Sequence, residues 1–316
     1  MNFLQRALEL AERGRGTTQP NPVVGAVLVS EGEVVGEGWH ERKGEPHAEA
    51  NALAEAGERA RGSTLYVTLE PCTSLGSTPP CAAAVIAAGV ERVVIGARDP
   101  NPAAAGGLEE LRSAGIQAEL AEGDLAFRAR QQNEAWLTWV TKHRPFVTYK
   151  AAVTLDGRMT LPGSRWISGE ESRRLVHELR ARSDAVAVGM ETARADRPQL
   201  TAREVGAERQ PRRLVFGRGP VPEGLELELV SGPVDSELQR LGKEGVQSLL
   251  LEGGATLAAS FLRAGLIDKL HVFVAPALAG SGPTLFGELD ESIQLRRLES
   301  RAVGEDVLLT AYVNEP

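Results

Sequence analysis

Apolar and polar positions along residues 1–144 follow two different periods, and the changes between them predict a series of strands and helices. Residues 1–14 carry apolar side chains at helical spacing among charged ones, which indicates an amphipathic helix. Apolar runs at 23–29 and 33–36, joined by a Glu-Gly turn, predict a β-hairpin. Further along, we expect a helix at 47–56, a strand at 64–70, a helix at 81–89, a strand at 92–97, a segment at 108–115, a strand near 117–120 and a helix at 125–142. This order is typical of an α/β domain with a mostly parallel sheet that is covered on its faces.

A second α/β domain is expected to begin at residue 145. Pro145 disfavours helix in the residue before it, and an apolar run at 146–155 predicts a strand directly afterwards. Further strands are expected at 185–190, 213–216 and 269–278, a loop rich in arginine and aspartate after the first of these, and a strand, glycine pair and helix over 248–265. Because no internal repeat relates the halves, we predict two unrelated α/β domains, 1–144 and 145–316.

Length, composition and charge agree with two globular domains and limit the kinds of partner. The chain has 316 residues, of which 42% are hydrophobic and 25% charged, ordinary values for two packed domains. A net charge of -8 without a long Lys/Arg run argues against a nucleic-acid partner that is bound through its phosphates. No apolar run approaches the roughly 20 residues that span a bilayer, and no cleavage site follows the first helix. We therefore expect neither a nucleic-acid nor a membrane partner.

The only two cysteines, Cys72 and Cys81, belong to a pattern typical of a catalytic metal site. So few cysteines without a secretory signal fit a reducing, cytoplasmic setting, where paired cysteines more often mean metal or catalysis than a disulfide. His47 and the two thiolates are three zinc ligands, which leaves a fourth tetrahedral position for water. Zinc lowers the pKa of such a water toward about 7 and so supplies hydroxide at neutral pH. Glu49, two residues after His47, is suited to carry protons between that water and the substrate.

Other interpretations of these residues stay open at this point. Each metal donor is expected where a helix begins, so that helix N-termini help to keep the sulfurs ionised. The cysteines could instead be small buried hydrophobic residues, and His47 an ordinary residue at a helix start. A closed structural zinc site would need a fourth protein ligand, for which His40 is the nearby candidate.

Three runs around these positions closely resemble the bacterial bifunctional riboflavin-biosynthesis deaminase/reductase family. They are TTQPNPVVGAVLV (17–29), GEGWHERKGEPHAEANAL (36–53) and YVTLEPCTSLGSTPPCAAAVIAAGVERVVIGARDPNP (66–102), and the resemblance continues to residue 316. Eight residues between the cysteines are characteristic of this family, whereas cytidine and transfer-RNA adenosine deaminases typically have two. The resemblance implies a cytidine-deaminase-like three-layer α/β/α fold followed by a dihydrofolate-reductase-like α/β fold.

The resemblance also implies two successive reactions on a small nucleotide. Zinc would support deamination of a diaminopyrimidinone ribosylamino 5′-phosphate to its uracil form, and NADPH would then reduce the ribose to a ribityl chain. His47, Cys72 and Cys81 would bind the zinc, with Glu49 as proton shuttle, and Asn21 and His40 would line the pyrimidine pocket. Without the family, a turn residue and a strand-end histidine explain those last two as well. The family also implies a homo-oligomer.

One loop departs from the family pattern. The family commonly has Ser-His after the first cysteine and often a basic residue after the glycine, whereas this chain has Thr73, Ser74, Leu75, Gly76 and Ser77. Two potential phosphate or substrate contacts are therefore absent. Because hydroxyl and backbone N–H groups can still hold a phosphate, we expect altered affinity rather than lost chemistry.

The second half lacks the G-x-G-x-x-G fingerprint of dinucleotide-binding folds. The strand that ends in Glu252-Gly253-Gly254 and opens a helix suits a phosphate, but taken alone a glycine pair before a helix is explained better by an ordinary tight turn. By resemblance, the NADPH contacts would be Ala152, Trp166, Thr192, Asp196, Gly254, Ala255 and Thr256. The substrate contacts would be Lys150, Ser164, Arg180, Leu200, Arg203 and Glu252, and Asp196 would contact both cofactor and substrate. Core packing is the alternative for Trp166, and a solvated loop for the Arg/Asp run.

Three other functions remain to be distinguished from the bifunctional enzyme. The first is a nucleic-acid base editor, against which the acidic balance and the cysteine spacing count. The second is a non-catalytic binding or structural protein in which zinc only stabilises the fold. The third is an active deaminase joined to an inactive reductase half.

Overall fold

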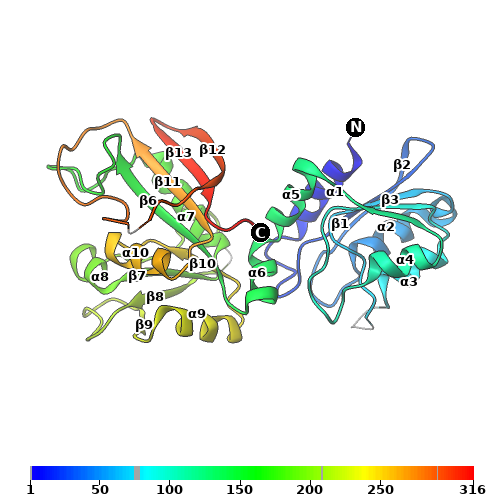
Figure 1. Ribbon diagram of the computed structural model, residues 1–316, viewed down its shortest axis with the longest axis horizontal. Coiled ribbons are helices and arrows are strands. Elements are labelled where there is room, and N and C mark those ends of the chain that lie inside the picture. The colour runs from blue at the N-terminus through cyan, green and yellow to red at the C-terminus, as the bar shows by residue number, and fades with distance from the viewer. Residues whose placement is uncertain (1, 75–78, 208, 290) are drawn as a thin grey trace. The chain divides into compact units, whose positions relative to one another are not determined.

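The computed structural model describes residues 2–74, 79–207, 209–289 and 291–316. The chain divides into two compact units, residues 1–142 together with Pro316, and residues 143–315 (Figure 1). Each unit has its own sheet and its own buried apolar clusters. The expectation of two α/β domains is confirmed.

The described part of the first unit contains a mixed five-stranded sheet in the order β2-β1-β3-β4-β5. Its strands are β1 (Gly25–Ser30), β2 (Glu33–Trp39), β3 (Thr64–Val67), β4 (Arg92–Ile95) and β5 (Gln117–Leu120). The β1–β2 hairpin was predicted. Strands β3, β4 and β5 pair in parallel, and β1 alone is reversed, because it pairs antiparallel with both of its neighbours, β2 and β3.

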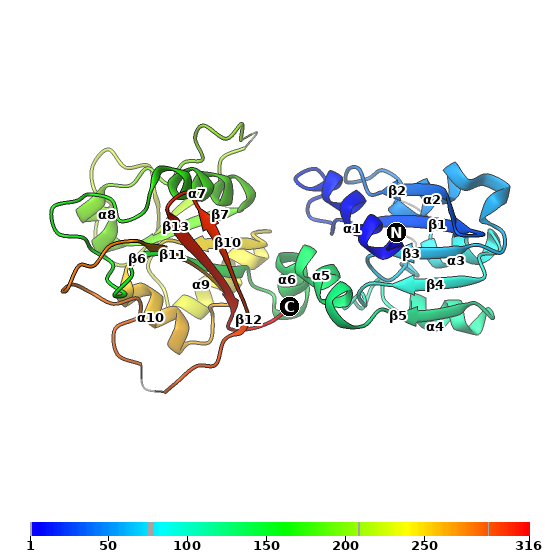
Figure 2. The same ribbon diagram turned by 90° about the horizontal axis from the view of Figure 1, so that it is seen from above.

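Helices cover both faces of this sheet and make three α/β/α layers (Figure 2). One face packs against α2 (Ala48–Ala56), α3 (Cys81–Ala87) and α4 (Gly107–Ser113). The other packs against α1 (Phe3–Ala11), α5 (Gly123–Gln132) and α6 (Glu134–Lys142). Short 3₁₀ turns follow α1 at Glu12–Gly14 and α2 at Gly57–Ala60.

The single helix expected at 125–142 is two helices that meet at Asn133. Asn133 has a φ of -114° and a ψ of 22°, outside the helical range, so the chain changes direction there. Its side-chain amide is bonded to the backbone of Val23, which lies 110 residues earlier in the chain. A contact so distant in sequence leaves no trace in the local apolar pattern.

Two glycines of β2 let α2 approach the sheet at backbone distance. A Cβ placed on Gly36 would overlap the carbonyl oxygen of Ala52, and one on Gly38 would overlap that of Ala48. Real side chains do not tolerate such overlaps, so the helix would have to move. The absence of these two side chains therefore sets the position of α2 and of the residue that begins it.

The second unit has, in its described residues, an eight-stranded sheet in the order β12-β13-β11-β6-β10-β7-β8-β9. Its strands are β6 (Phe146–Thr154), β7 (Ala185–Gly189), β8 (Arg212–Phe216), β9 (Glu228–Val230), β10 (Ser248–Leu251), β11 (Lys269–Ala275), β12 (Arg296–Val303) and β13 (Asp306–Tyr312). The strands from β11 to β9 in this order run parallel, and β13 and β12 continue the sheet antiparallel. The mostly parallel sheet predicted from sequence fits this unit.

Helices also cover both faces of the second sheet. One face packs against α9 (Val234–Lys243) and α10 (Ala255–Arg263), and the other against α7 (Glu170–Arg182) and α8 (Met190–Asp196). The Arg/Asp-rich run after β7 was expected as a loop, but it begins as α8 because Met190 and Ala193 pack one helix face into the core. None of the helices in the described ranges is long and apolar enough to cross a membrane.

Candidate active sites

Three predicted metal donors of the first unit converge. His47 precedes the first residue of α2, Cys81 is the first residue of α3, and Cys72 lies in the segment between β3 and α3. The Nδ1 atom of His47 is 3.6 Å from Cys72 Sγ and 3.3 Å from Cys81 Sγ, and all three donor atoms lie within 4.8 Å of one another. The expectation that every donor begins a helix is wrong for Cys72, which lies in non-helical chain.

This donor set fits zinc. For Zn–N and Zn–S bonds of ordinary length, two tetrahedral ligands lie about 3.6 Å apart, close to the distances from His47. Among the described residues, the cluster holds these three donors and no fourth. His40, the candidate for a closed site, has its ring engaged elsewhere, because Nδ1 lies 3.2 Å from the carbonyl oxygen of Pro46 and Nε2 lies 3.3 Å from Asn21 Nδ2. The arrangement is that of an open, catalytic zinc site.

Glu49 lies in the first turn of α2 beside the donor cluster, and it is almost fully buried, with 3% of its surface exposed. Burial raises the pKa of its carboxyl group to about 7. Hydrogen bonds from Cys81 and His47 lower the pKa of Cys72, which favours its thiolate form. A buried carboxyl next to a thiolate-containing metal site is the arrangement required of a proton shuttle.

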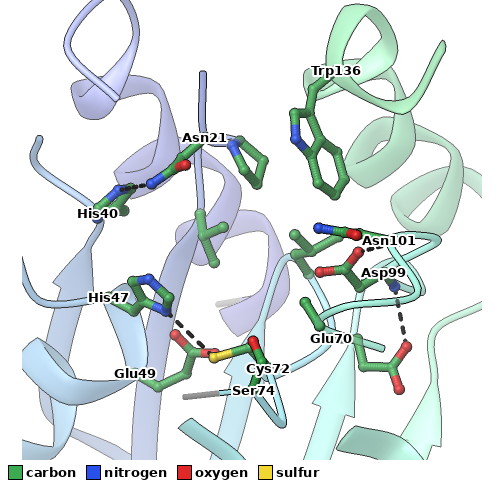
Figure 3. Close-up of a pocket in the computed structure, with 14 residues that line it drawn as sticks. Asn21, His40, His47, Glu49, Glu70, Cys72, Ser74, Asp99, Asn101 and Trp136 are labelled. Carbon is green, nitrogen blue, oxygen red and sulfur yellow. Dashed lines mark hydrogen bonds between the residues drawn. The ribbon is translucent and has the colours of Figure 1, made fainter. Parts of the chain in front are cut away.

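A cavity of about 330 Å³ opens onto the cluster (Figure 3). Its walls come from the loop before β1, the end of β2, the segments that follow β3 and β4, and helix α6. The lining residues are Asn21, Pro22, Val24, His40, His47, Glu49, Leu69, Glu70, Cys72, Ser74, Asp99, Asn101, Ala104 and Trp136. The cavity is thus at the carboxyl ends of two parallel strands, the usual place for ligands in α/β sheets.

The structure brings Asn21 and His40 together in one wall of this cavity. Burial lowers the pKa of His40, which favours a neutral ring. A neutral ring that donates from Nδ1 to Pro46 accepts at Nε2 from the side-chain N–H of Asn21. The Oδ1 atom of Asn21 then remains as an acceptor for a ligand with N–H donors.

Asp99, Asn101 and Trp136 also line the cavity, and sequence reasoning assigned them no role. Asp99 Oδ1 accepts from the backbone N–H of Asn101 at 2.8 Å, and burial raises the pKa of Asp99 to about 6. Glu70 has a structural role, because its carboxylate accepts the backbone N–H groups of Asp99 and Leu108. The DPNP run directly after a strand could have indicated the first two residues, whereas Trp136 had no local signal.

The loop that departs from the family pattern is only partly described. Thr73 Oγ1 donates to the carbonyl oxygen of Ala105 at 2.9 Å, which gives Thr73 a structural role. Ser74 lines the cavity. Leu75, Gly76 and Ser77 lie outside the described residues, so the expected change in affinity stays a prediction.

A second polar cluster in the other unit collects three of the residues predicted to hold substrate. Arg180 on α7 donates from Nε and Nη2 to the two oxygens of Glu252, at 2.6 and 2.9 Å. Lys150 on β6 lies 3.8 Å from the same carboxylate, and burial lowers the pKa of Lys150. The Nη1 atom of Arg180 donates to the carbonyl oxygen of Thr201. Arg180 therefore holds Glu252 and the chain near Arg203 in place.

Several of the predicted cofactor residues lie at the start of α10 and on α8. Gly254 precedes α10, and a Cβ placed there would be 3.4 Å from Thr192 Oγ1 on α8, so the two residues are neighbours. Ala255 and Thr256 form the first turn of α10. Ala152 lies on β6, paired with β11, and Asp196 is exposed at the end of α8.

Three predicted contacts have surroundings that the sequence did not indicate. Trp166 is 54% exposed and stacks with the guanidinium groups of Arg165 and Arg173, so the alternative of core packing is wrong. Ser164 Oγ donates to the carbonyl oxygen of Trp166 at 2.7 Å and shapes this turn. Leu200 is buried in the apolar core, which leaves only its backbone to contact a ligand.

Arg203 is exposed, and its guanidinium donates to Gln199 Oε1 at 2.6 Å. Its side chain is therefore accessible to a solvent-borne anion. Glu252 and Lys150, by contrast, are nearly enclosed, with 8% and 17% of their side chains exposed.

Comparison with known families covers both units. Residues 1–97 match the cytidine and deoxycytidylate deaminase zinc-binding region, and residues 145–309 match the RibD C-terminal domain. The three metal donors all lie within the first of these matches. The second match begins at the proline where a new domain was expected.

Full-length relatives and solved structures agree with these matches. The riboflavin biosynthesis protein RibD of Aquifex aeolicus is 40% identical, over 98% of this chain and 97% of its own, and that of Escherichia coli is 41% identical, over 97% of each. The RibD structure from Acinetobacter baumannii superposes with a TM-score of 0.82 at 37% identity. A diaminohydroxyphosphoribosylaminopyrimidine deaminase/5-amino-6-(5-phosphoribosylamino)uracil reductase from Thermotoga maritima superposes with a TM-score of 0.83 at 34% identity. Each structural match covers 98% of this chain and 97% of the other.

Proposed function

Because this chain belongs to the RibD family of riboflavin-biosynthesis proteins, we propose that its two domains, 1–144 and 145–316, catalyse successive reactions on one nucleotide. The protein is a bifunctional deaminase/reductase of riboflavin biosynthesis. The first domain deaminates a 2,5-diamino-6-ribosylamino-pyrimidinone 5′-phosphate. The second reduces the ribosyl group of 5-amino-6-(5-phosphoribosylamino)uracil to ribityl with NADPH.

The main support for the deaminase activity is the cluster of His47, Cys72 and Cys81, with the buried Glu49 beside it at one cavity. Zinc, when bound to these donors, supplies a water of lowered pKa and an open coordination position. Glu49 would carry one proton of the attacking water to the ring nitrogen. It would then carry the proton of the added hydroxyl to the amine, which leaves as ammonia when the C–N bond breaks. Asn21 Oδ1 accepts an N–H of the substrate and orients the ring. His40 fixes that orientation through Asn21 Nδ2.

In the reductase domain, a buried ion pair and an exposed arginine contribute in different ways. Arg180 and Glu252 hold each other and the chain at Thr201, so that Glu252 presents its carboxylate to a sugar hydroxyl. Arg203 and Lys150 supply positive charge to the substrate phosphate and the sugar. Ser164 and the backbone of Leu200 complete the substrate contacts.

The cofactor is assigned to the side of this cluster formed by α8 and α10. The N-terminus of α10, at Gly254, Ala255 and Thr256, suits a phosphate of NADPH, because its N–H groups point away from the helix. The other proposed contacts are Ala152, Trp166, Thr192 and Asp196. Hydride transfer then requires that nicotinamide and sugar carbon be held in register.

The remaining proposals concern the setting. We place the enzyme in the cytoplasm as a homo-oligomer that acts on a free nucleotide rather than on nucleic acid, a choice supported by the acidic charge balance. Ammonia release from the free nucleotide, with none from oligonucleotides, distinguishes it from a base editor.

Substitution of Glu49 tests the deaminase while the reductase serves as internal control. We expect Glu49→Gln to retain zinc and to lose deamination by at least about 100-fold, the usual contribution of general acid–base catalysis. NADPH oxidation with the uracil intermediate should be unchanged. The matched control is Glu58→Gln, an exposed glutamate just after α2, which should leave both activities intact. A Glu49→Gln enzyme that retains zinc and deaminates within threefold of wild type would contradict the proposed proton shuttle.

A further inference from the structure

We infer that Asn133 is a positioning residue of the deaminase pocket, and that it sets Trp136 against the substrate across from Asn21. The inference rests on the proposed deaminase function of the same cavity. It concerns the wall formed by α6, which the metal cluster does not include.

Asn133 occupies the junction of α5 and α6 and is buried, with 5% of its surface exposed. Its backbone N–H donates to the carbonyl oxygen of Arg130, in the last turn of α5. Its carbonyl oxygen accepts from Leu137, the start of the next. The backbone thus belongs to both helices, and the side chain is left to act elsewhere.

That side chain bonds both backbone groups of a single distant residue. Asn133 Oδ1 accepts from the N–H of Val23 at 2.9 Å, and Nδ2 donates to the carbonyl oxygen of Val23 at 2.8 Å. An amide makes this pair of bonds because it carries a donor and an acceptor side by side. A carboxylate would place an acceptor against the carbonyl oxygen of Val23, and an alanine would leave both groups unpaired in a buried place.

Val23 and Asn133 each adjoin a wall of the cavity. Asn21 and Pro22, just before Val23, line one side, and Trp136, one helical turn after Asn133, lines another. Figure 3 shows Asn21, bonded to His40, on one side of the lining and the Trp136 indole on the other. The two bonds of one amide therefore fix the separation between these walls.

Trp136 is the large flat apolar side chain in this lining. It is buried except for 7% of its surface, and Leu69 and Val24 add apolar surface nearby. Such a wall suits the face of a planar pyrimidine or the apolar side of its ribosyl group. Trp136 contacts the substrate, and Asn133 acts through it and through the Asn21 loop.

This role predicts a particular kinetic pattern. Neither residue belongs to the donor cluster of the described chain, so their loss should leave zinc content unchanged. Loss of an aromatic contact of this kind corresponds to roughly a three- to tenfold change in binding. We expect Trp136→Ala and Asn133→Asp to raise KM for the pyrimidine nucleotide by that factor, with kcat changed less than about twofold.

The test measures both activities and zinc content of the full-length variants Asn133→Asp, Trp136→Ala and Trp136→Phe, with zinc present. Trp136→Phe keeps a flat ring and should return KM to within about twofold of wild type. The matched control is Gln132→Ala, which removes a neighbouring amide that bonds Leu8 and Glu12 rather than the pocket wall. It should leave KM unchanged.

Several outcomes would overturn the inference. Unchanged KM in both Asn133→Asp and Trp136→Ala would do so, as would an equal effect in Gln132→Ala. Parallel loss of deamination, zinc and reductase activity in every variant, including Trp136→Phe, would assign these residues to folding alone. A wild-type enzyme that deaminates no free nucleotide would instead refute the proposed function, which the variants do not test.

Discussion

His271 should make the stability of the second unit depend on pH in a way that one substitution removes. It lies on β11, in register with Lys150 on β6, and its Nδ1 atom is 2.9 Å from Thr310 Oγ1. Burial, with smaller contributions from Lys269 and Arg301, lowers the pKa of His271 to about 3. The perturbation is His271→Asn, which keeps a polar atom near Thr310 and cannot titrate.

The sign and size follow from linkage. The folded pKa of His271 is about 3 and the unfolded value is about 6.5, so between these pH values the unfolded chain binds the proton more tightly. Below about pH 6.5 the unfolded chain gains a proton on His271, whereas the folded chain keeps this histidine neutral. The free energy of unfolding therefore decreases as the pH falls. Each pH unit in this window costs about 1.4 kcal/mol, which gives about 2 kcal/mol between pH 7 and pH 5.

The assay is hydrogen–deuterium exchange of the full-length protein in urea, read in peptides that cover β11. It reports the opening free energy of this sheet without requiring that both units unfold together. Wild type should lose about 2 kcal/mol more than His271→Asn between pH 7 and pH 5. Carboxylates titrate in both proteins and cancel in the difference. Parallel pH dependence of the two proteins would refute the reasoning.

Two further substitutions test the packing of each unit. Asp268→Asn should destabilise the second unit by about 3–5 kcal/mol in urea unfolding, because it leaves the buried Arg144, now bonded at 2.7 and 2.8 Å, without a counter-charge. The control Glu226→Gln, at a pair whose glutamate is 85% exposed, should cost less than about 1 kcal/mol. Gly38→Ala should push α2 away at Ala48, destabilise the first unit by about 1–3 kcal/mol and lower bound zinc per chain, with NADPH oxidation unaffected. An alanine variant that retains full zinc would contradict that contact.

The metal donors could be predicted because residue types and short sequence spacings are enough to identify them. His47, Glu49 and the two cysteines were assigned from residue type and spacing, and the structure places His47 and Cys81 at helix starts, as the strand–helix order predicted. Cys72 differs because it lies in non-helical chain after β3, and α3 starts only at Cys81, directly after Pro80. The error concerned local conformation and left the donor assignment unaffected.

The parts that sequence reasoning missed depend on distant contacts or on weak patterns. The break at Asn133 and the pocket wall at Trp136 follow from a bond to Val23, which no window of neighbouring residues contains. Helix α7 was not predicted because it is dominated by charged residues and buries few side chains, among them Ser172 and Val176. The pairing of Arg180 with Glu252 likewise joins two elements 72 residues apart.

The Asn133 junction also has a consequence for the order in which the protein is made. The last of the three metal donors is Cys81, so all three donors are synthesised before Asn133 and Trp136. A growing chain therefore carries two thiols and an imidazole before the wall beside them exists. During that interval the thiols face solvent, where a competing thiophilic ion or an oxidant reaches them more easily than in the finished enzyme.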